Sequence, residues 1–316
     1  MSAFDAAQVA ESVRTRLPGT EVREAEPMAQ HTSFRAGGAA DLFVPVRSSQ
    51  TLYGLIRFFG EQGIPYVILG RGSNVLVSDL GYHGAVLTLQ ADVFCDLEVR
   101  GEEMICGAAV SLHQAAEAAC EAGLSGMEAL AGIPGSIGGA LAMNAGAYGT
   151  EMKDVVHMVK ALDAERESTE EADPLVDITN AGMHFGYRTS VAKERPLVFL
   201  KTILRLQKGN PEEIRNKMRD FREQRREKQP LEYPSAGSTF KRPEGHFAGK
   251  LIEEAGLRGY SVGGAQVSEK HCGFVINKGG ASATDILTLM RNVRERVHET
   301  FGVTLEPEVM ILGEEL

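Results

Sequence analysis

The sequence lacks tryptophan and holds only four cysteines in 316 residues. Their spacing fits no CxxC or zinc-ligand pattern, so we expect free thiols, a reducing compartment and no metal site. No run of about 18 apolar residues occurs, which excludes a transmembrane helix. The first residues also contain no apolar segment of signal-peptide length. These absences together predict a cytoplasmic protein.

Positive charge is also in short supply. The chain has 33 Lys and Arg against 43 Asp and Glu, a formal net charge of −10. Nucleic-acid binding requires a basic face, so nucleic acid is disfavoured as the main partner. Hydrophobic residues make up 43% and charged residues 24%, which is the composition of a folded protein. At ~100–200 residues per domain, the length predicts two or three domains.

Apolar periodicity divides the chain into units. Helical spacing occurs at 5–17, 50–63, 111–122, 210–230 and 284–301. Buried strands are expected at 65–70 and 85–89, and further strands at 154–163 and 196–206. We expect an α+β protein divided into units at 1–90, 91–207, 208–303 and 304–316, the last being a C-terminal segment.

A glycine-containing turn lies between two apolar segments at 69–81. Gly70 and Gly72 could let backbone N–H groups face an anion, as in a phosphate-binding nest. The GxGxxG fingerprint of Rossmann folds is absent, because Val75 stands where the third glycine would be. An apolar strand also follows where the Rossmann fold has a helix. An ordinary hairpin with glycine turns is the alternative.

A second segment, 126–149, contains seven glycines in 24 residues. Glycine inside a helix or strand costs ~0.5–1 kcal/mol relative to alanine, so this density needs a reason. We interpret it as backbone wrapped closely around a ligand that carries phosphates. A set of loop turns remains the alternative.

Three single residues could take part in acid–base or anion chemistry. Arg188 in HFGYRTS is suited to bind a carboxylate with two hydrogen bonds, or forms a surface ion pair. Ser238 could point its hydroxyl into a pocket or cap a turn; no GxSxG motif surrounds it. Glu308 lies in an extended segment and could equally be solvated.

Basic residues gather near the end of the helix at 210–230. Their positive charges interact favourably with the helix dipole at that end. Alternatively, they form an edge that binds a diphosphate. They are Arg219, Arg222, Arg225, Arg226 and Lys228.

Taken in order, these segments resemble the UDP-N-acetylenolpyruvoylglucosamine reductase (UDP-N-acetylmuramate dehydrogenase) family. The matching strings run over 31–309, nearly the whole chain. They are HTSFRAGG (31–38), LGRGSNVLVSD (69–79), GIPGSIGGALAMNAGAYG (132–149), FGYRTS (185–190), SAGSTFKRP (235–243), AGKLIEEAGLRG (248–259), GGAQVSEKHCGFVIN (263–277) and LEPEV (305–309).

The resemblance implies a two-part FAD-binding domain of the p-cresol methylhydroxylase/vanillyl-alcohol oxidase type, followed by an α/β substrate-binding domain. It also implies non-covalent FAD, NADPH as co-substrate and a nucleotide-sugar substrate reduced for peptidoglycan synthesis. We expect a monomer with no membrane or nucleic-acid partner. The short spacing from Arg188 to Ser238 is similar to the subclass that lacks a substrate-covering tyrosine loop.

Residue roles are carried over by position in these strings. The catalytic set implied is Arg188, Ser238 and Glu308. The cofactor-binding set is Gly70, Arg71, Gly72, Ser73, Asn74, Gly132, Ile133, Pro134, Gly135, Ser136, Gly138, Gly139, Asn144, Ala145 and Gly146. The substrate-binding set is Tyr187, Arg222, Arg225, Arg226, Lys241, Arg242 and Lys250. Arg242 stands where many members of the family have asparagine.

The implied reaction saturates a vinyl ether next to a carboxylate, so negative charge develops at that carboxylate. Arg188 would neutralise it, Ser238 would deliver a proton to carbon, and Glu308 would help only when protonated. We therefore expect burial to raise the pKa of Glu308. Two alternatives stay open: another FAD oxidoreductase of this fold acting on an alcohol or sugar, and a non-catalytic flavin-binding regulator.

Overall fold

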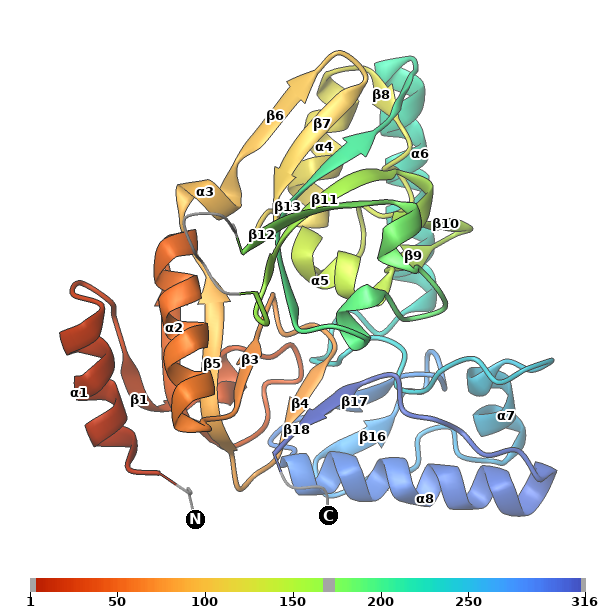
Figure 1. Cartoon of the computed structure of the whole chain (residues 1–316). Helices are drawn as coiled ribbons and strands as arrows, with labels where there is room; N and C mark the ends of the chain where they lie inside the picture. Colours follow the sequence, from red (N-terminus) through yellow and green to blue (C-terminus); the bar gives the residue numbers. More distant parts are fainter. Residues whose placement is uncertain (1–3, 167–173, 314–316) are drawn as a thin grey trace.

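The computed structural model describes residues 4–166 and 174–313. Within these ranges, three larger sheets of four, five and three strands follow one another along the chain with flanking helices. Figure 1 shows the first at the left, the second at the top and the third at the lower right. Of the C-terminal segment predicted at 304–316, residues 314–316 lie outside the described part. No helix in the described ranges is long and apolar enough to span a bilayer.

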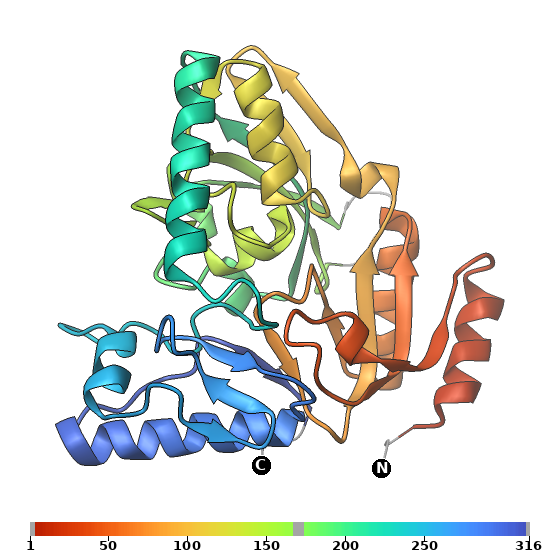
Figure 2. The same cartoon turned by 180° about the vertical axis from the view of Figure 1, so that it is seen from behind.

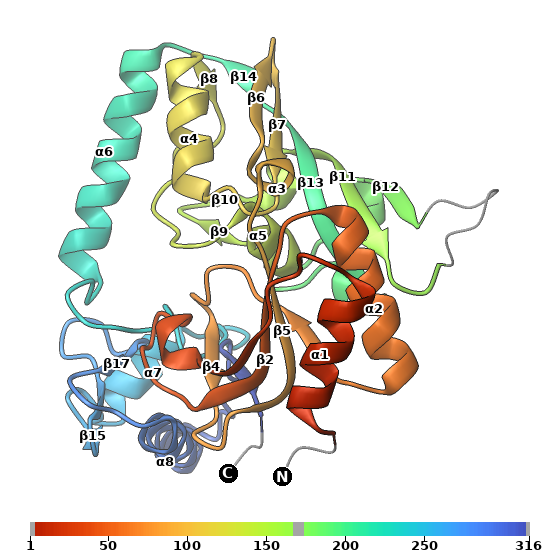
Figure 3. The same cartoon turned by 90° about the vertical axis from the view of Figure 1, so that its left-hand side faces the viewer.

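The first unit is a four-stranded sheet with two helices on one side, as Figures 1 and 3 show. Leu42, Val44 and Val46 alternate along one strand and belong to the same buried cluster as residues of both helices. The strand order is β1 (Arg23–Pro27), β2 (Ala39–Val46), β5 (Tyr82–Leu89) and β3 (Tyr66–Ile68), and the helices are α1 (Ala6–Arg16) and α2 (Ser49–Gln62).

The helix and strand boundaries in this unit follow local chemistry. Ser48 caps α2 by accepting a hydrogen bond from the Thr51 N–H at 3.0 Å, and Gly63 ends it in the left-handed region at φ +64°. The strand predicted at 65–70 is shorter and only half-buried. The expected burial is wrong because β3 is an edge strand of the sheet and its residues line a cavity.

The second unit is a five-stranded antiparallel sheet covered by α4, α5 and α6, as Figures 2 and 3 show. Ser111 caps α4, the helix expected at 111–122. The strand order is β12 (Leu175–Thr179), β11 (Val156–Asp163), β13 (Leu197–Arg205), β7 (Glu103–Gly107) and β6 (Leu97–Arg100). The helices are α4 (Leu112–Glu121), α5 (Ile137–Met143) and α6 (Pro211–Lys228), and the short elements are α3 (Asp92–Cys95), β8 (Leu124–Ser125), β9 (Gly146–Ala147), β10 (Thr150–Glu151) and β14 (Gln207–Lys208).

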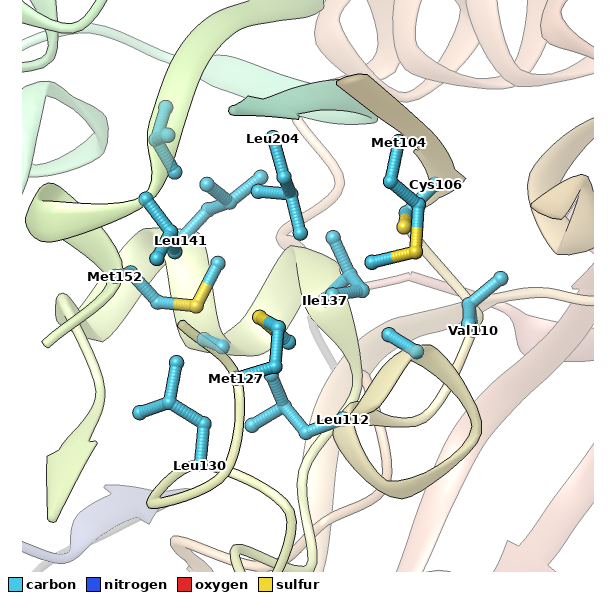
Figure 4. Close-up of a cluster of buried hydrophobic side chains, with 14 of the residues drawn as sticks. Met104, Cys106, Val110, Leu112, Met127, Leu130, Ile137, Leu141, Met152 and Leu204 are labelled. Carbon is cyan, nitrogen blue, oxygen red and sulfur yellow. The ribbon is translucent and has the colours of Figure 1, made fainter. Parts of the chain in front are cut away.

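Figure 4 shows the core of this unit, where apolar side chains from the sheet and from the helices meet. Ile214 and Met218 of α6 belong to the same cluster. We therefore propose that the third unit begins after α6, near Gln229, although the sequence pattern placed the boundary at 208.

The third unit combines a small antiparallel sheet with α7 (Ala248–Glu254) and α8 (Ala283–Phe301). Its strands are β15 (Ser261–Val262), β16 (Ala265–Val267) and β17 (Val275–Asn277). Its core also contains Phe34 and Leu76 of the first unit. The first and third units thus share apolar packing.

Polar contacts fasten these two units together. The C-terminal strand β18 (Met310–Leu312) pairs in parallel with β4 (Val75–Val77). The Asp79 carboxylate accepts the N–H groups of Ala283 and Thr284, at 2.8 and 2.7 Å, at the start of α8. Burial alone would raise the pKa of Asp79, but these hydrogen bonds hold it below its usual value.

Candidate active site

The glycine turn after β3 packs against a segment distant in sequence. Gly72 has φ +61°, and a Cβ there would overlap the carbonyl oxygen of His31. The Ser33 N–H donates to the Gly72 oxygen at 3.0 Å. Glycine is therefore required at position 72 by close packing of backbone on backbone.

The second glycine segment becomes the start of α5. The Ser136 hydroxyl caps this helix and accepts from the Gly139 N–H at 3.4 Å. A Cβ at Gly70 would lie 2.7 Å from the same hydroxyl oxygen. The two segments singled out from the sequence thus touch, and the glycine at 70 permits the contact.

These two segments line one wall of a cavity of about 890 Å³. Of the predicted cofactor-binding set, the wall contains Gly70, Arg71, Ser136, Gly138 and Gly139. The remaining members lie outside it: Gly72, Ser73, Asn74, Gly132, Ile133, Pro134, Gly135, Asn144, Ala145 and Gly146.

Sequence reasoning missed most of the other wall. It comes from 30–33, Arg35, 66–69, 88–90, 197–199 and 231–234. Of these residues, the strings that carried the resemblance contain only 31–33 and Arg35, in HTSFRAGG, and Leu69, which opens LGRGSNVLVSD. The others are strand edges and a loop, whose inward-facing positions depend on how the two sheets meet.

Arg188 occupies a strained turn that the side chain of Asn144 supports through hydrogen bonds. Its φ is +54°, and Gly186 and Thr189 exchange backbone hydrogen bonds around it. The buried Asn144 amide donates to the Gly186 oxygen at 3.0 Å and to Glu151 at 3.0 Å, and its oxygen accepts the Lys153 N–H. The polar groups of Asn144 are therefore used within the protein, and they support the turn that presents Arg188.

Ser238 is carried by a segment that crosses the third unit. Gly237 precedes it with φ +76°. The Thr239 N–H donates to the Gly273 oxygen at 2.9 Å, and the Thr239 hydroxyl accepts the Val275 N–H at 2.9 Å. This bracing fixes the backbone next to the Ser238 hydroxyl.

Glu308 meets Arg188 across 120 positions of sequence. The Arg188 Nε donates to Glu308 Oε1 at 2.5 Å, and the side chains are 21% and 11% exposed. Burial is the largest influence and raises the pKa of Glu308, while Arg188, Lys241 and the Tyr187 hydroxyl oppose that rise. The predicted direction is confirmed.

Arg188, Ser238 and Glu308 line one further cavity, of about 400 Å³. Its wall also contains Tyr187, Arg242 and Lys250 from the predicted substrate-binding set. Arg258, Lys270 and His271 lie in the same wall and were missed. The Arg242 guanidinium lies 4.0 Å from the centre of the Phe247 ring, and the Arg242 N–H donates to the Tyr187 hydroxyl at 3.0 Å.

The other predicted substrate contacts lie elsewhere. Lys241 forms an ion pair with Glu306 at 2.9 Å, and Arg222 faces Glu117 at 3.6 Å. Arg225 packs on the glycine loop, since a Cβ at Gly132 would lie 2.6 Å from its Cδ. Burial lowers the pKa of Arg225. Lys270 donates to the backbone oxygen of Arg226 at 2.6 Å. Among the described residues that line the two cavities, Arg222, Arg225 and Arg226 do not occur.

The larger cavity fits a dinucleotide such as FAD. Its volume lies at the upper end of the ~300–1,000 Å³ range of ligand sites. The start of α5, which carries a partial positive charge, and the Arg71 side chain line it. Added Cβ atoms at Gly70 and Gly138 would meet neighbouring atoms at 2.7 and 3.0 Å, so the wall at these positions has no room for side chains.

Comparison with known proteins agrees with this geometry. A family model described as FAD binding domain matches residues 40–169, which include most of the cavity wall from the first two sheets. A second model, UDP-N-acetylenolpyruvoylglucosamine reductase, C-terminal domain, matches residues 229–312. The match to the FAD binding domain confirms the expected fold class and cofactor.

Relatives over the whole length carry the same name. The UDP-N-acetylenolpyruvoylglucosamine reductase of Caldanaerobacter subterraneus subsp. tengcongensis is 48% identical over 289 residues, which cover 92% of this chain and 93% of that protein. That of Clostridioides difficile is 48% identical over 299 residues, covering 95% and 96%.

A solved structure supports the same assignment. The crystal structure of UDP-N-acetylenolpyruvylglucosamine reductase from Thermus caldophilus superposes with a TM-score of 0.77 at 33% identity, covering 93% of this chain and 99% of that one. The chain therefore belongs to the family of UDP-N-acetylenolpyruvoylglucosamine reductases, which are FAD oxidoreductases.

Proposed function

We propose that this protein reduces UDP-N-acetylglucosamine enolpyruvate to UDP-N-acetylmuramate in peptidoglycan synthesis, with NADPH as co-substrate and FAD held without a covalent bond. One observation carries the proposal. Three groups from distant segments, Arg188, Ser238 and Glu308, line a single cavity, which is what reduction next to a carboxylate requires. Two relatives that are 48% identical to this chain are named UDP-N-acetylenolpyruvoylglucosamine reductase.

Saturating the vinyl group requires one hydride and one proton. The hydride would come from FAD held in the larger cavity, with NADPH as its source. The residues proposed to hold FAD are Gly70, Arg71, Ser136, Gly138 and Gly139, which line the larger cavity. The chain itself must supply the proton and stabilise the charge that develops beside the carboxylate.

Arg188 is proposed to bind the substrate carboxylate. A guanidinium stays charged and offers several donors in one plane, which matches two carboxylate oxygens. Its Nε already donates to Glu308, so the remaining N–H groups are the ones proposed for substrate. Donors aimed at developing charge are usually the largest single contribution to catalysis; removing one costs ~10²–10³ in rate.

Ser238 is proposed to deliver the proton to carbon. A hydroxyl is a weak acid, so it acts only when held close to the reacting carbon. The hydrogen bonds of the neighbouring Thr239 provide that rigidity. Glu308 is proposed to act in its protonated form, which burial favours.

The basic wall of the smaller cavity is proposed to hold the substrate phosphates. Arg242 and Lys250 were expected from the sequence, and Arg258 and Lys270 lie in the same wall. Alanine at Arg242 or Lys250 should raise KM with little change in kcat, while alanine at Arg222, which pairs with Glu117, serves as the matched control. An equal KM for all variants would contradict this placement.

The remaining part of the proposal is that the protein is a monomer and acts in the cytoplasm. The proposed catalytic groups Arg188, Ser238 and Glu308 all belong to one chain, so the proposed site does not require a second copy. Cys95, Cys106, Cys120 and Cys272 are all free thiols, as expected of a reducing compartment.

Product analysis tests the function. Purified protein, NADPH and UDP-N-acetylglucosamine enolpyruvate should give one product heavier by two hydrogens, with one NADPH oxidised for each product molecule. NADPH oxidation that proceeds without this substrate would favour another FAD oxidoreductase of this fold. Bound FAD with no turnover of any acceptor would favour a flavin-binding regulator.

A further inference from the structure

Asn74 directs its polar groups at the segment that leads from Glu308 into β18. Its amide Nδ2 donates to the backbone oxygen of Glu308 at 3.0 Å. Its own backbone oxygen accepts from the Met310 N–H, also at 3.0 Å. Parallel pairing of β4 with β18 then continues from Val75, which lies opposite Met310. Among the described residues lining the two cavities, Asn74 does not occur.

The peptide of Glu308 is held from the opposite side as well. Its N–H donates to the Thr239 oxygen at 2.9 Å, and Phe240 forms an isolated bridge with Pro307. Thr239 is the residue next to Ser238. The backbone of Glu308 is therefore fixed between Asn74 of the first unit and Thr239 of the third.

The turn that ends in Asn74 begins at the other cavity. Gly70 and Arg71 line the 890 Å³ cavity, and three residues later Asn74 contacts Glu308 of the 400 Å³ cavity. One short turn thus connects the proposed cofactor wall with a proposed catalytic carboxyl. Its rigidity comes from backbone contacts, including the Ser33 N–H that donates to the Gly72 oxygen.

We propose that Asn74 is a positioning residue: its amide fixes the Glu308 peptide relative to the wall of the larger cavity and so aims the Glu308 carboxyl at Arg188 and the substrate. The link to substrate rests on the function proposed above. The link to Arg188 rests only on the contacts described here.

Loss of this hydrogen bond should affect chemistry more than binding. The Glu308 carbonyl would lose its side-chain donor, and the carboxyl would move relative to the reacting atoms. A misplacement of about 1 Å can cost ~10² in rate. We therefore expect Asn74→Ala to slow reoxidation of the reduced holoenzyme by substrate by ~10–100-fold, with KM changed by less than about threefold. FAD affinity and the rate of reduction by NADPH should stay within about twofold, because Asn74 is outside the cavity wall.

A double variant distinguishes a positioning role of Asn74 from a general loss of structure. In a Glu308→Ala background, Asn74→Ala should add less than about a twofold further loss, because its effect passes through Glu308. Asn74→Asp keeps the shape but replaces the donor with an acceptor, so it should slow the same step even if Asn74→Ala folds poorly. Asn180→Ala is the matched control, since its half-buried amide also donates to backbone, the Lys153 and Val156 oxygens, each at 2.7 Å.

A stability measurement tests the proposal without substrate. The Arg188–Glu308 coupling is obtained from urea midpoints of the holoenzyme with Arg188→Met, Glu308→Gln and both. In the Asn74→Ala background this coupling should fall by about half or more. An unchanged coupling, loss of FAD affinity, or an equal slowing with and without Glu308 would overturn the proposal. If the unsubstituted enzyme does not react with the substrate, the proposed function fails, and the coupling still decides the role of Asn74.

Discussion

Breaking the Arg188–Glu308 pair gives a stability loss whose size depends on pH. The substitution is Arg188→Met, which keeps an unbranched side chain but removes the charge and the 2.5 Å hydrogen bond. Glu308 is only 11% exposed, and both influences of Arg188 on it lower its pKa. In the variant, burial acts with less opposition, so the pKa of Glu308 rises further above its ordinary value.

The size of the stability loss depends on whether the buried Glu308 carboxyl is ionised or protonated. Breaking a fully buried pair costs ~3–5 kcal/mol, and the 21% exposure of Arg188 reduces this to about 2–4 kcal/mol when Glu308 is ionised. When Glu308 is protonated, the variant loses one hydrogen bond, about 1 kcal/mol. The pH dependence should therefore amount to about 1–3 kcal/mol.

The sign comes from proton linkage. A carboxyl whose pKa is raised on folding holds its proton more tightly in the folded state, so stability is full below the unfolded pKa of about 4.3 and falls as pH rises through the folded value. The difference between variant and original protein should open as pH rises through the raised folded pKa of Glu308 in the original protein, and level off above the still higher folded pKa in the variant. The original protein should show the same trend more weakly.

Urea unfolding at several pH values, with FAD at one saturating concentration, measures the effect, because a ligand bound to the folded state shifts apparent stability. Adding Glu308→Gln to Arg188→Met should restore about 1–3 kcal/mol at pH 8, since no buried charge remains. Activity should not return. An equal loss at low and high pH, or a double variant no more stable than Arg188→Met, would refute the reasoning.

Three further outcomes are expected. Ser238→Ala should still be reduced by NADPH but should lose ~10²–10⁴ in the rate of reoxidation by substrate, measured by anaerobic stopped flow; two fast half-reactions would exclude Ser238 as proton donor. Gly72→Ala should weaken FAD binding or folding, because its Cβ would overlap the His31 oxygen, and Gly60→Ala, whose Cβ meets nothing within 4 Å, is the control. Asp79→Asn should destabilise by about 0.5–2 kcal/mol at neutral pH; because the pKa of Asp79 is lowered in the folded state, this loss should shrink as pH falls through that value.

Local patterns predicted much of the fold. The spacing of apolar residues gave α1, α2, α4, α6 and α8, and caps at Ser48, Ser111 and Asn210 mark where three of them begin. Packing of whole units was not predictable in this way. The pattern assigned α6 to the third unit, whereas Ile214 and Met218 lie in the core of the second.

Site residues could be predicted where they belong to a local motif. They could not be predicted where their role depends on a contact between units that are distant in sequence. Gly70 was singled out because a glycine turn leaves a mark in the sequence, whereas Ser136 was expected only from the family resemblance. Asn74 and Asn144 lie in the same motifs, yet their amides hold Glu308 and Gly186, contacts that span 234 and 42 positions. Arg258 and Lys270 lie in strings that carried the resemblance but received no role, since a cation by itself indicates no ligand until the fold places it in a cavity wall.

The most direct test is an anaerobic two-step experiment on the purified holoenzyme. NADPH is added first, and bleaching of the oxidised flavin band is followed; UDP-N-acetylglucosamine enolpyruvate is then added. Bleaching followed by rapid recovery of the band is the predicted result. Bleaching without recovery would contradict the proposed substrate, and a protein that binds no FAD would contradict the assignment of the larger cavity.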